Sequence, residues 1–173
     1  MTHTVRAHFA EGFEGKTVVA RLLPGTDLLS GIEEVCRANQ MKYATISSCF
    51  GSLKKAGYVY LVEKPETNIG AGYGELISRN GPIEFLNGTG IVCQRDDQFE
   101  THIHGTMCDH NGAVFGGHLI KGENKVLTVD LVLKEIKNMT VLRSFDSETG
   151  GYQLYPLEKG KTEPAFLELN SEK

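Results

Sequence analysis

Residues 101–119, THIHGTMCDHNGAVFGGHL, hold four of the chain's six histidines, and three of them, His102, His104 and His118, flank a single turn signal. His102 and His104 are two residues apart, so in a strand both side chains point to the same face, with Cα atoms about 6.6 Å apart. Thirteen residues separate His104 from His118, and Asp109-His110-Asn111-Gly112 between them is typical of a turn. The pairing across that turn decides whether the three imidazoles meet.

A two-residue turn would keep the third histidine away from the other two. If Asn111 and Gly112 alone form the loop, His118 lies opposite Gly105 in the hairpin. Because side chains alternate along a strand, His118 would then point to the opposite face of the sheet from the His-x-His pair.

A three-residue turn, His110-Asn111-Gly112, gives the other result. With Gly112 in the left-handed conformation, Asp109 pairs with Ala113 and His104 pairs with His118. Directly opposite residues on adjacent strands have Cβ atoms about 5 Å apart on one face. Glycine is the residue that this loop type favours at its last position, so we predict that the three histidines converge.

Three converging imidazoles are typical of a metal site. We predict a divalent metal, zinc-like, at His102, His104 and His118, because zinc binds imidazole nitrogen and three histidines plus an open position describe catalytic zinc. Iron, nickel and copper also accept imidazole. Gly116 and Gly117 remove side chains where another backbone or a ligand could approach His118. The alternative is that the histidines lie on a solvated sheet face or in a polar core.

The four cysteines, Cys36, Cys49, Cys93 and Cys108, are irregularly spaced and form no CxxC pair, which favours buried free thiols over disulfides. Cys93, Cys108 and Glu84 are candidates for a fourth metal ligand or a general base. Placement in the core or on the surface is the interpretation that we favour for these three residues.

A single amphipathic helix is expected over residues 27–40, because apolar residues from Leu28 recur at i+1, i+4, i+7 and i+8. Thr26 or Asp27 supplies the N-cap. Runs rich in β-branched and aromatic residues, bounded by turn residues, predict strands over 16–23, 43–49, 56–63, 82–86, 90–93, 98–108, 113–120, 126–136 and 140–145. One helix among about seven to nine strands indicates an α+β fold with a mostly antiparallel sheet.

A chain of 173 residues fits one domain, which we place at 16–157. Residues 1–15 are expected to form a loose N-terminal arm, and the polar residues 158–173 a frayed C-terminal tail. Residues 64–80, rich in glycine, predict a long excursion with a short strand near 75–78. Loops of this length in a compact domain are often functional or line an interface.

The net charge of −4 and the pI of about 5.9 oppose non-specific binding to DNA or anionic lipid, because phosphate neutralisation supplies most of that affinity. No apolar run approaches the 18 residues of a membrane helix, and no apolar stretch follows the N-terminus as in a signal peptide. A cytoplasmic location is the default expectation.

Several stretches together resemble the Plants and Prokaryotes Conserved (PPC) domain. They occur in that family's order over about residues 17–146, and they are RLLPGTDL at 21–28, GSL at 51–53, GPIEFL at 81–86, HIH at 102–104 and FGGHL at 115–119. The resemblance implies an α+β domain with a largely antiparallel sheet, assembled as a homotrimer. Some stand-alone prokaryotic members carry a metal at the positions that match His102, His104 and His118.

The resemblance also brings a DNA-binding label, which fits this chain poorly. In land plants the domain follows an AT-hook in nuclear DNA-binding regulators, and many prokaryotic members take the label from that kinship. An AT-hook needs an Arg-Gly-Arg-Pro-like core for the minor groove, and the chain contains no Arg-Gly pair.

Three functions therefore stay open. The first is a trimeric regulator acting through protein or DNA contacts. The second is a metal-dependent, hydrolase-like enzyme or small-ligand binder that does not bind DNA. The third is a plain oligomeric scaffold with structural histidines. The residues assign no catalytic role, and they leave open whether the protein is an enzyme.

Overall fold

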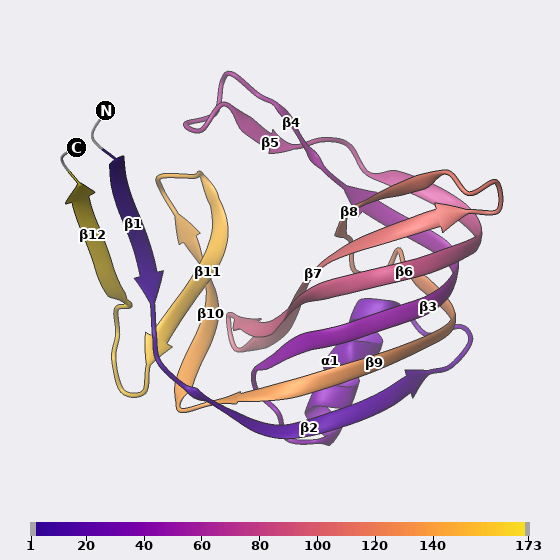
Figure 1. Cartoon of the computed structure of the whole chain (residues 1–173), viewed down its shortest axis with the longest axis horizontal. Coiled ribbons are helices and arrows are strands. Elements are labelled where there is room, and N and C mark those ends of the chain that lie inside the picture. The colour runs from indigo at the N-terminus through magenta and orange to yellow at the C-terminus, as the bar shows by residue number, and fades with distance from the viewer. Residues whose placement is uncertain (1–2, 172–173) are drawn as a thin grey trace.

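The computed structural model describes residues 3–171, which form twelve strands and one helix (Figure 1). The elements are β1 (His3–Phe9), β2 (Phe13–Leu22), α1 (Leu28–Ala38), β3 (Ala44–Val59), β4 (Leu61–Glu63), β5 (Ala71–Tyr73), β6 (Ile77–Arg95), β7 (Gln98–Asp109), β8 (Val114–Leu119), β9 (Lys125–Lys137), β10 (Met139–Asp146), β11 (Gly151–Glu158) and β12 (Ala165–Ser171). The α+β class with one main helix is confirmed.

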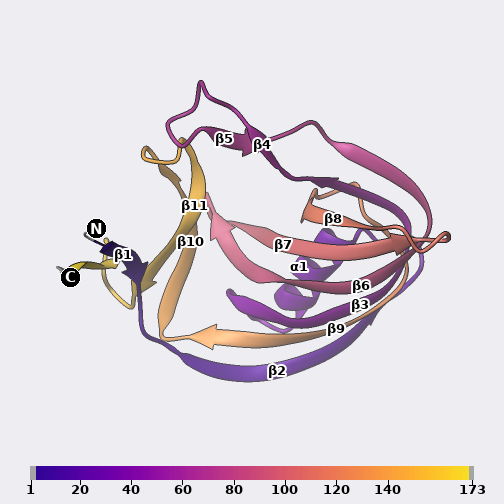
Figure 2. The same cartoon turned by 45° about the horizontal axis from the view of Figure 1, so that its top comes forward.

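Eight of the strands form one curved sheet in the order β11-β10-β6-β7-β8-β3-β9-β2. All pairings in it are antiparallel except a short parallel contact between β10 and β6. Strand β3 also pairs with β6, so the pairings β3-β6-β7-β8 return to β3. Figure 2 shows the long strands curving together, with the β10–β11 hairpin standing beyond their ends. This curvature turns β7 and β8 toward the hairpin.

Helix α1 packs on one face of the sheet and supplies the core with an apolar stripe. Leu28, Ile32 and Cys36 are fully buried there. The N-cap is Asp27, whose carboxylate accepts a hydrogen bond from the backbone N–H of Ser30 at 3.0 Å. The predicted helix and its cap are confirmed. Because α1 is the one helix of residues 3–171, the opposite face of the sheet has no helix over it.

Two pairs of predicted strands are continuous in the structure. Residues 44–59 form the single strand β3, and residues 77–95 form β6. At Gly51 an added Cβ would lie 2.2 Å from the Thr128 carbonyl oxygen, so the glycine allows close approach of β9 rather than ending the strand. In β6 the Asn87-Gly88 dipeptide forms no turn, because the strand continues past it with a bulge between Phe85 and Asn87.

The predictions of a loose N-terminal arm and a frayed C-terminal tail are wrong for their described residues. Strand β1 pairs with β12 over seven positions, with Val5 opposite Leu169 and Ala7 opposite Leu167. Strand β11, which was not predicted, pairs with β10. Long-range pairing gives the polar tail an ordered partner that no local signal specifies. Whether residues 16–157 fold as an independent domain stays a prediction.

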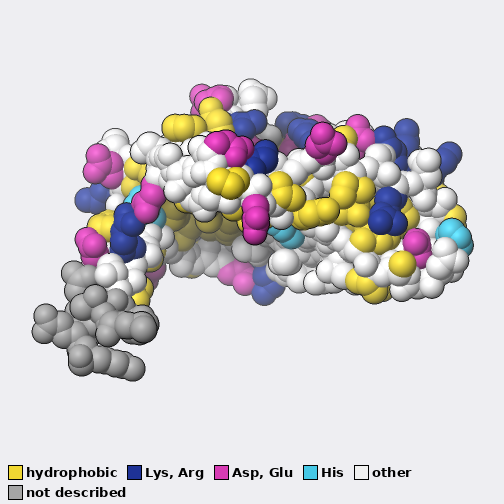
Figure 3. Space-filling model, turned by 90° about the horizontal axis from the view of Figure 1, so that it is seen from above, with side chains coloured by type: hydrophobic (Ala, Val, Ile, Leu, Met, Phe, Trp, Pro, Cys, Tyr) yellow, Lys and Arg dark blue, Asp and Glu magenta, His cyan; other side chains and the backbone are white. Residues whose placement is uncertain are grey.

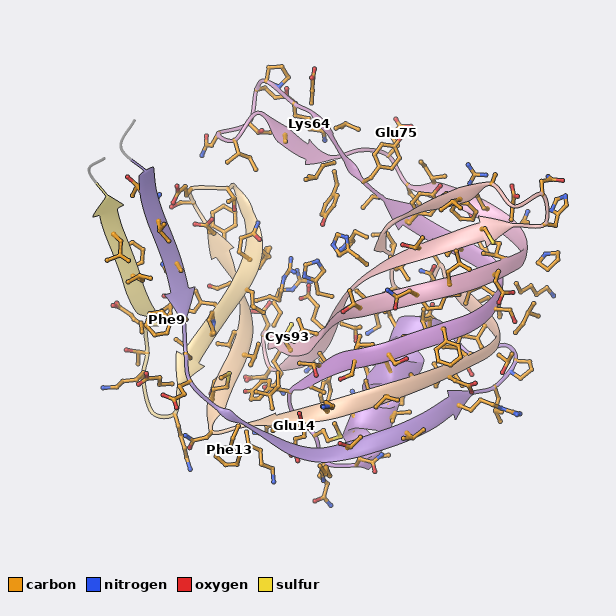
Figure 4. All side chains as sticks on the ribbon, in the orientation of Figure 1. Phe9, Phe13, Glu14, Lys64, Glu75 and Cys93 are labelled. Carbon is orange, nitrogen blue, oxygen red and sulfur yellow. The ribbon has the colours of Figure 1, made fainter. Side chains whose placement is uncertain are left out.

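The excursion at 64–80 contains a small hairpin of β4 and β5 and extends toward the β10–β11 turn (Figures 1 and 4). Figure 4 labels Lys64 and Glu75 on this segment. The Asn68 side-chain amide donates to the Ser147 carbonyl at 3.0 Å, which links the excursion to that turn. The strand expected near 75–78 begins at Ile77, where β6 starts.

Candidate metal centre

The hairpin of β7 and β8 has the three-residue turn that places the three histidines on one face of the sheet. The Asp109 N–H donates to the Ala113 carbonyl at 3.1 Å, and Gly112 adopts the left-handed conformation with φ of 80°. His104 is directly opposite His118 in the register. The predicted register is confirmed, and its local cause is the glycine at the last loop position.

His102, His104 and His118 form one cluster on the face of the sheet away from α1. Their ring centroids are 4.9 to 5.3 Å apart, and one ligand nitrogen from each lies within 4.8 Å of the others. The two Nε2 atoms of His102 and His104 are 3.2 Å apart. Two ligands at zinc–nitrogen distances of 2.0–2.1 Å in a tetrahedron are about 3.3 Å apart, so this pair fits a zinc-like ion.

The space around the cluster leaves room for a further ligand. His104 is exposed and lines a recess of about 410 Å³ together with Thr89 and Gly116. Figure 3 shows histidine atoms in a hollow of the face seen from above, with apolar side chains around them. An ion held by the three imidazoles would therefore keep an open position toward solvent.

Burial keeps two of the histidines neutral. The pKa of His102 is lowered to about 4, first by burial and then by the positive charge of Arg143. The pKa of His118 is also lowered to about 4, by burial and then by His104 and Arg143. Metal binding requires deprotonated imidazole nitrogen, so both residues are in the required form at neutral pH. Among the described residues, no group is a hydrogen-bond partner of the buried His118 Nδ1.

The two glycines beside His118 make room for backbone, not for a ligand. An added Cβ on Gly116 would lie 2.1 Å from the Gly105 carbonyl oxygen, and one on Gly117 would lie 2.3 Å from the Val59 carbonyl oxygen. The two neighbouring strands, β7 and β3, therefore approach His118 closely and fix its position in the sheet.

Arg143 and Tyr73 adjoin the cluster, and no sequence pattern predicted either residue there. Tyr73 of β5 stacks on the His118 ring, with centroids 4.9 Å apart. Arg143 of β10 places Nη1 2.6 Å from His102 Nδ1. Only the path of the excursion and of β10 brings these side chains to β7 and β8, and no local pattern marks them.

The Arg143 contact fixes the tautomer of His102. A guanidinium donates hydrogen bonds and cannot accept them, so His102 Nδ1 accepts and the imidazole proton sits on Nε2. If His102 held a metal through Nε2, its imidazole proton would lie on Nδ1, and the Arg143 guanidinium would need another acceptor. The Glu100 carboxylate, with Oε1 3.6 Å from Arg143 Nε, is the nearby acceptor for the released guanidinium.

The other candidates lie outside the cluster. Glu84 is exposed and pairs with Cys108, four residues farther along β7 than His104 in a strand that rises about 3.3 Å per residue. Cys93 is buried, and its thiol bonds the Glu100 carbonyl at 3.2 Å. Burial raises the pKa of Cys93 to about 12, which keeps the thiol protonated. All four cysteines are free, as predicted.

Comparison with known proteins identifies the family. The model of the Plants and Prokaryotes Conserved (PCC) domain matches residues 9–137, so the chain belongs to this family. A metal-containing protein of Archaeoglobus fulgidus is similar, with 28% identity, a TM-score of 0.71, and coverage of 83% of this chain and 95% of the other. A plant- and prokaryote-conserved protein of Pyrococcus horikoshii has 25% identity, a TM-score of 0.71, and coverage of 84% and 96%.

Two further sets of similar proteins do not assign a function to this chain. The bifunctional protein GlmU of two Synechococcus strains is 29% and 28% identical over 135 residues, and the chain spans about a fifth of those proteins. Proteins of Ralstonia eutropha and Bacteroides thetaiotaomicron, whose names suggest DNA binding, are 18% and 14% identical with TM-scores of 0.64, which shows the fold alone. Among the described residues, no helix is long and apolar enough to span a membrane.

Proposed function

We propose that the protein binds a divalent metal, zinc-like, through His102, His104 and His118, and that this metal serves small-molecule chemistry. The observation that carries the proposal is the meeting of three imidazoles on one sheet face, with His104 open to solvent. The similar protein of Archaeoglobus fulgidus is a metal-containing protein, which supports a metal in this fold.

A bound zinc-like ion supplies Lewis acidity and lowers the pKa of bound water toward 7, which suits hydrolysis. The residues of the chain would prepare the site for that ion. Burial holds His102 and His118 neutral, the Tyr73 ring covers His118, and the recess beside His104 admits a small molecule. The carboxylate that could act as a base near the cluster is Glu100, two residues from His102 on the same strand.

Metal analysis of the purified protein tests the proposal. We expect about one equivalent of metal per chain in the wild type after zinc loading, and a loss of at least tenfold in zinc affinity in His104→Ala, since one of three ligands is removed. His110→Ala is the matched control, because His110 lies in the turn and outside the cluster. Less than a tenth of an equivalent in the wild type, or equal metal in both variants, would refute the site.

We also propose that the protein assembles as a homotrimer. Val19 and Phe50 are 76% and 50% exposed, and each has sequence neighbours in the core on the helix side, so both lie on the open face. Apolar side chains on such a face are typical of an interface. Light scattering should give three times the chain mass of 19.0 kDa. Val19→Lys should reduce that mass, whereas Val5→Lys, at an exposed site on β1, should not.

Direct DNA binding is the alternative function. Its support is the names of two proteins that share the fold, and the net charge of −4 opposes it. We expect no gel shift with mixed-sequence or A·T-rich duplex at micromolar protein and moderate salt. A shift that weakens steeply with added salt would establish phosphate contacts and favour a regulatory role instead.

A further inference from the structure

A cavity of about 240 Å³ lies beside the histidine cluster, between α1 and the edge of β7. His118 lines it and is also a member of the cluster. The edge of β7 is unpaired there because β8 pairs with β7 only over His104–Cys108 and then pairs with β3. A gap in the sheet therefore places a small cavity next to the candidate metal centre.

Unmet hydrogen-bonding capacity gathers at this cavity. Among the described residues, four buried side-chain polar atoms lack a hydrogen-bond partner, and three of them belong to residues that line the cavity: Glu100 Oε2, Thr101 Oγ1 and His118 Nδ1. Thr101 is only 6% exposed. Buried polar atoms are nearly always bonded, so such a group marks a place where another molecule completes the bonds.

The atoms that need partners are donors. Glu100 Oε2 already lies 3.0 Å from Arg95 Nε in an ion pair. The Thr101 hydroxyl can donate, and His118 Nδ1 carries the proton when Nε2 holds a metal. These two groups therefore await an acceptor, such as a carboxylate oxygen.

The charge around the cavity also favours an anion. Glu33, with a side chain 5% exposed, pairs with Lys121 at 2.5 Å. Glu100 pairs with Arg95 and with Arg143. Arg95 and Lys121 line the cavity and balance the charges of Glu33 and Glu100. Arg143 contacts Glu100 from outside the lining and adds one positive charge nearby, and a divalent ion at the cluster would add two more. An anionic ligand would be attracted to this place.

Apart from Gln98, the remaining wall of the cavity is apolar, and the volume is small. Leu29, Phe99, Leu119 and Ile120 line it. At about 30 Å³ for each water-sized group, 240 Å³ holds about eight non-hydrogen atoms. That size excludes a nucleotide and suits an acid with a short hydrocarbon chain.

We infer that this cavity binds a short-chain carboxylate. Its carboxylate faces Thr101, His118 and Arg95, and its chain lies against Phe99 and Leu119. The inference deepens the proposed function by naming the substrate class, and it rests on that function only through the shared residue His118.

Calorimetry with butyrate tests the inference, with butanamide as the neutral isostere and inorganic phosphate as an oxyanion without a chain. We expect butyrate to bind saturably, at least tenfold more tightly than either comparison compound, as loss of one charge-assisted hydrogen bond implies. Thr101→Val and Arg95→Gln should each weaken butyrate about tenfold. Arg21→Gln is the control, because Arg21 is exposed on β2 at the far edge of the sheet.

Each outcome decides the inference. Equal or tighter binding of butanamide or phosphate, absence of saturable butyrate binding, or equal affinity in all three variants would overturn it. Chemical shifts of wild-type backbone amides on butyrate addition give a test that needs no variant: the largest changes should fall on residues 99–101 and 118–121. Measurements on chelated and zinc-loaded protein separate the two proposals. Butyrate binding to the chelated protein supports the carboxylate cavity whatever the outcome at the metal site, and a zinc titration tests the metal site by itself.

Discussion

Acidification of the metal-free protein should destabilise it between pH 7 and pH 5, through His102 and His118. Both have a folded-state pKa of about 4 against 6.5 when unfolded. The unfolded chain therefore binds more protons in this range, and the free energy of unfolding falls as pH falls. The stability from these two groups is complete above pH 6.5 and is lost progressively as pH approaches 4.

The magnitude follows from the two shifts. At pH 5, about 1.5 units below the unfolded pKa, each histidine alone would lower the free energy of unfolding by about 2 kcal/mol, at about 1.4 kcal/mol for each pH unit. Because both side chains are only half-buried, solvent screening halves this value, which gives about 2 kcal/mol for the pair. For a chain of this size the melting temperature should fall by about 4–8 °C.

Thermal unfolding from pH 7 to pH 5, with chelator present, measures the effect. A variant with His102→Gln and His118→Gln should lose most of the slope, whereas His110→Gln should keep it. The carboxylates with lowered pKa values, such as Asp109 and Asp146, act below this range, since an unfolded aspartate titrates near 3.8. A melting temperature that is constant between pH 7 and pH 5, or an equal slope in both variants, would refute the reasoning.

Three further measurements probe the cluster and its supports. Zinc at about 100 times its dissociation constant should stabilise the wild type by about 2.7 kcal/mol in chemical unfolding, and at the same zinc concentration His104→Ala should gain less than half of that. Gly112→Val should lower the free energy of unfolding by about 1–2 kcal/mol, because Gly112 has a φ of 80°, and should also lower zinc affinity. Gly112→Asn is the milder control, and unchanged stability in Gly112→Val would contradict the turn geometry. Asp27→Ala should lower the free energy of unfolding by about 1–2 kcal/mol in the same assay, since the carboxylate caps α1 and accepts a hydrogen bond from the Gly122 N–H at 3.0 Å. A loss under 0.5 kcal/mol would argue against the cap.

The sequence determined the local parts of this protein. The apolar stripe from Leu28 and the cap at Asp27 specify α1, because helix signals lie within one turn of each other. The turn ending at Gly112 specifies the register that brings His118 opposite His104, because hairpin pairing follows from loop length and one backbone conformation. The meeting of the three histidines was therefore predictable from residues 101–119.

The tertiary structure alone decided what surrounds them. Arg143 reaches His102 from β10, Tyr73 covers His118 from β5, and Glu33 of α1 lies beside the unpaired edge of β7. The pairing of β1 with β12 joins the two ends of the chain in the same way. Contacts between residues so far apart depend on the path of the whole backbone and on the balance of many small packing energies, which leave no periodic or local pattern in the sequence.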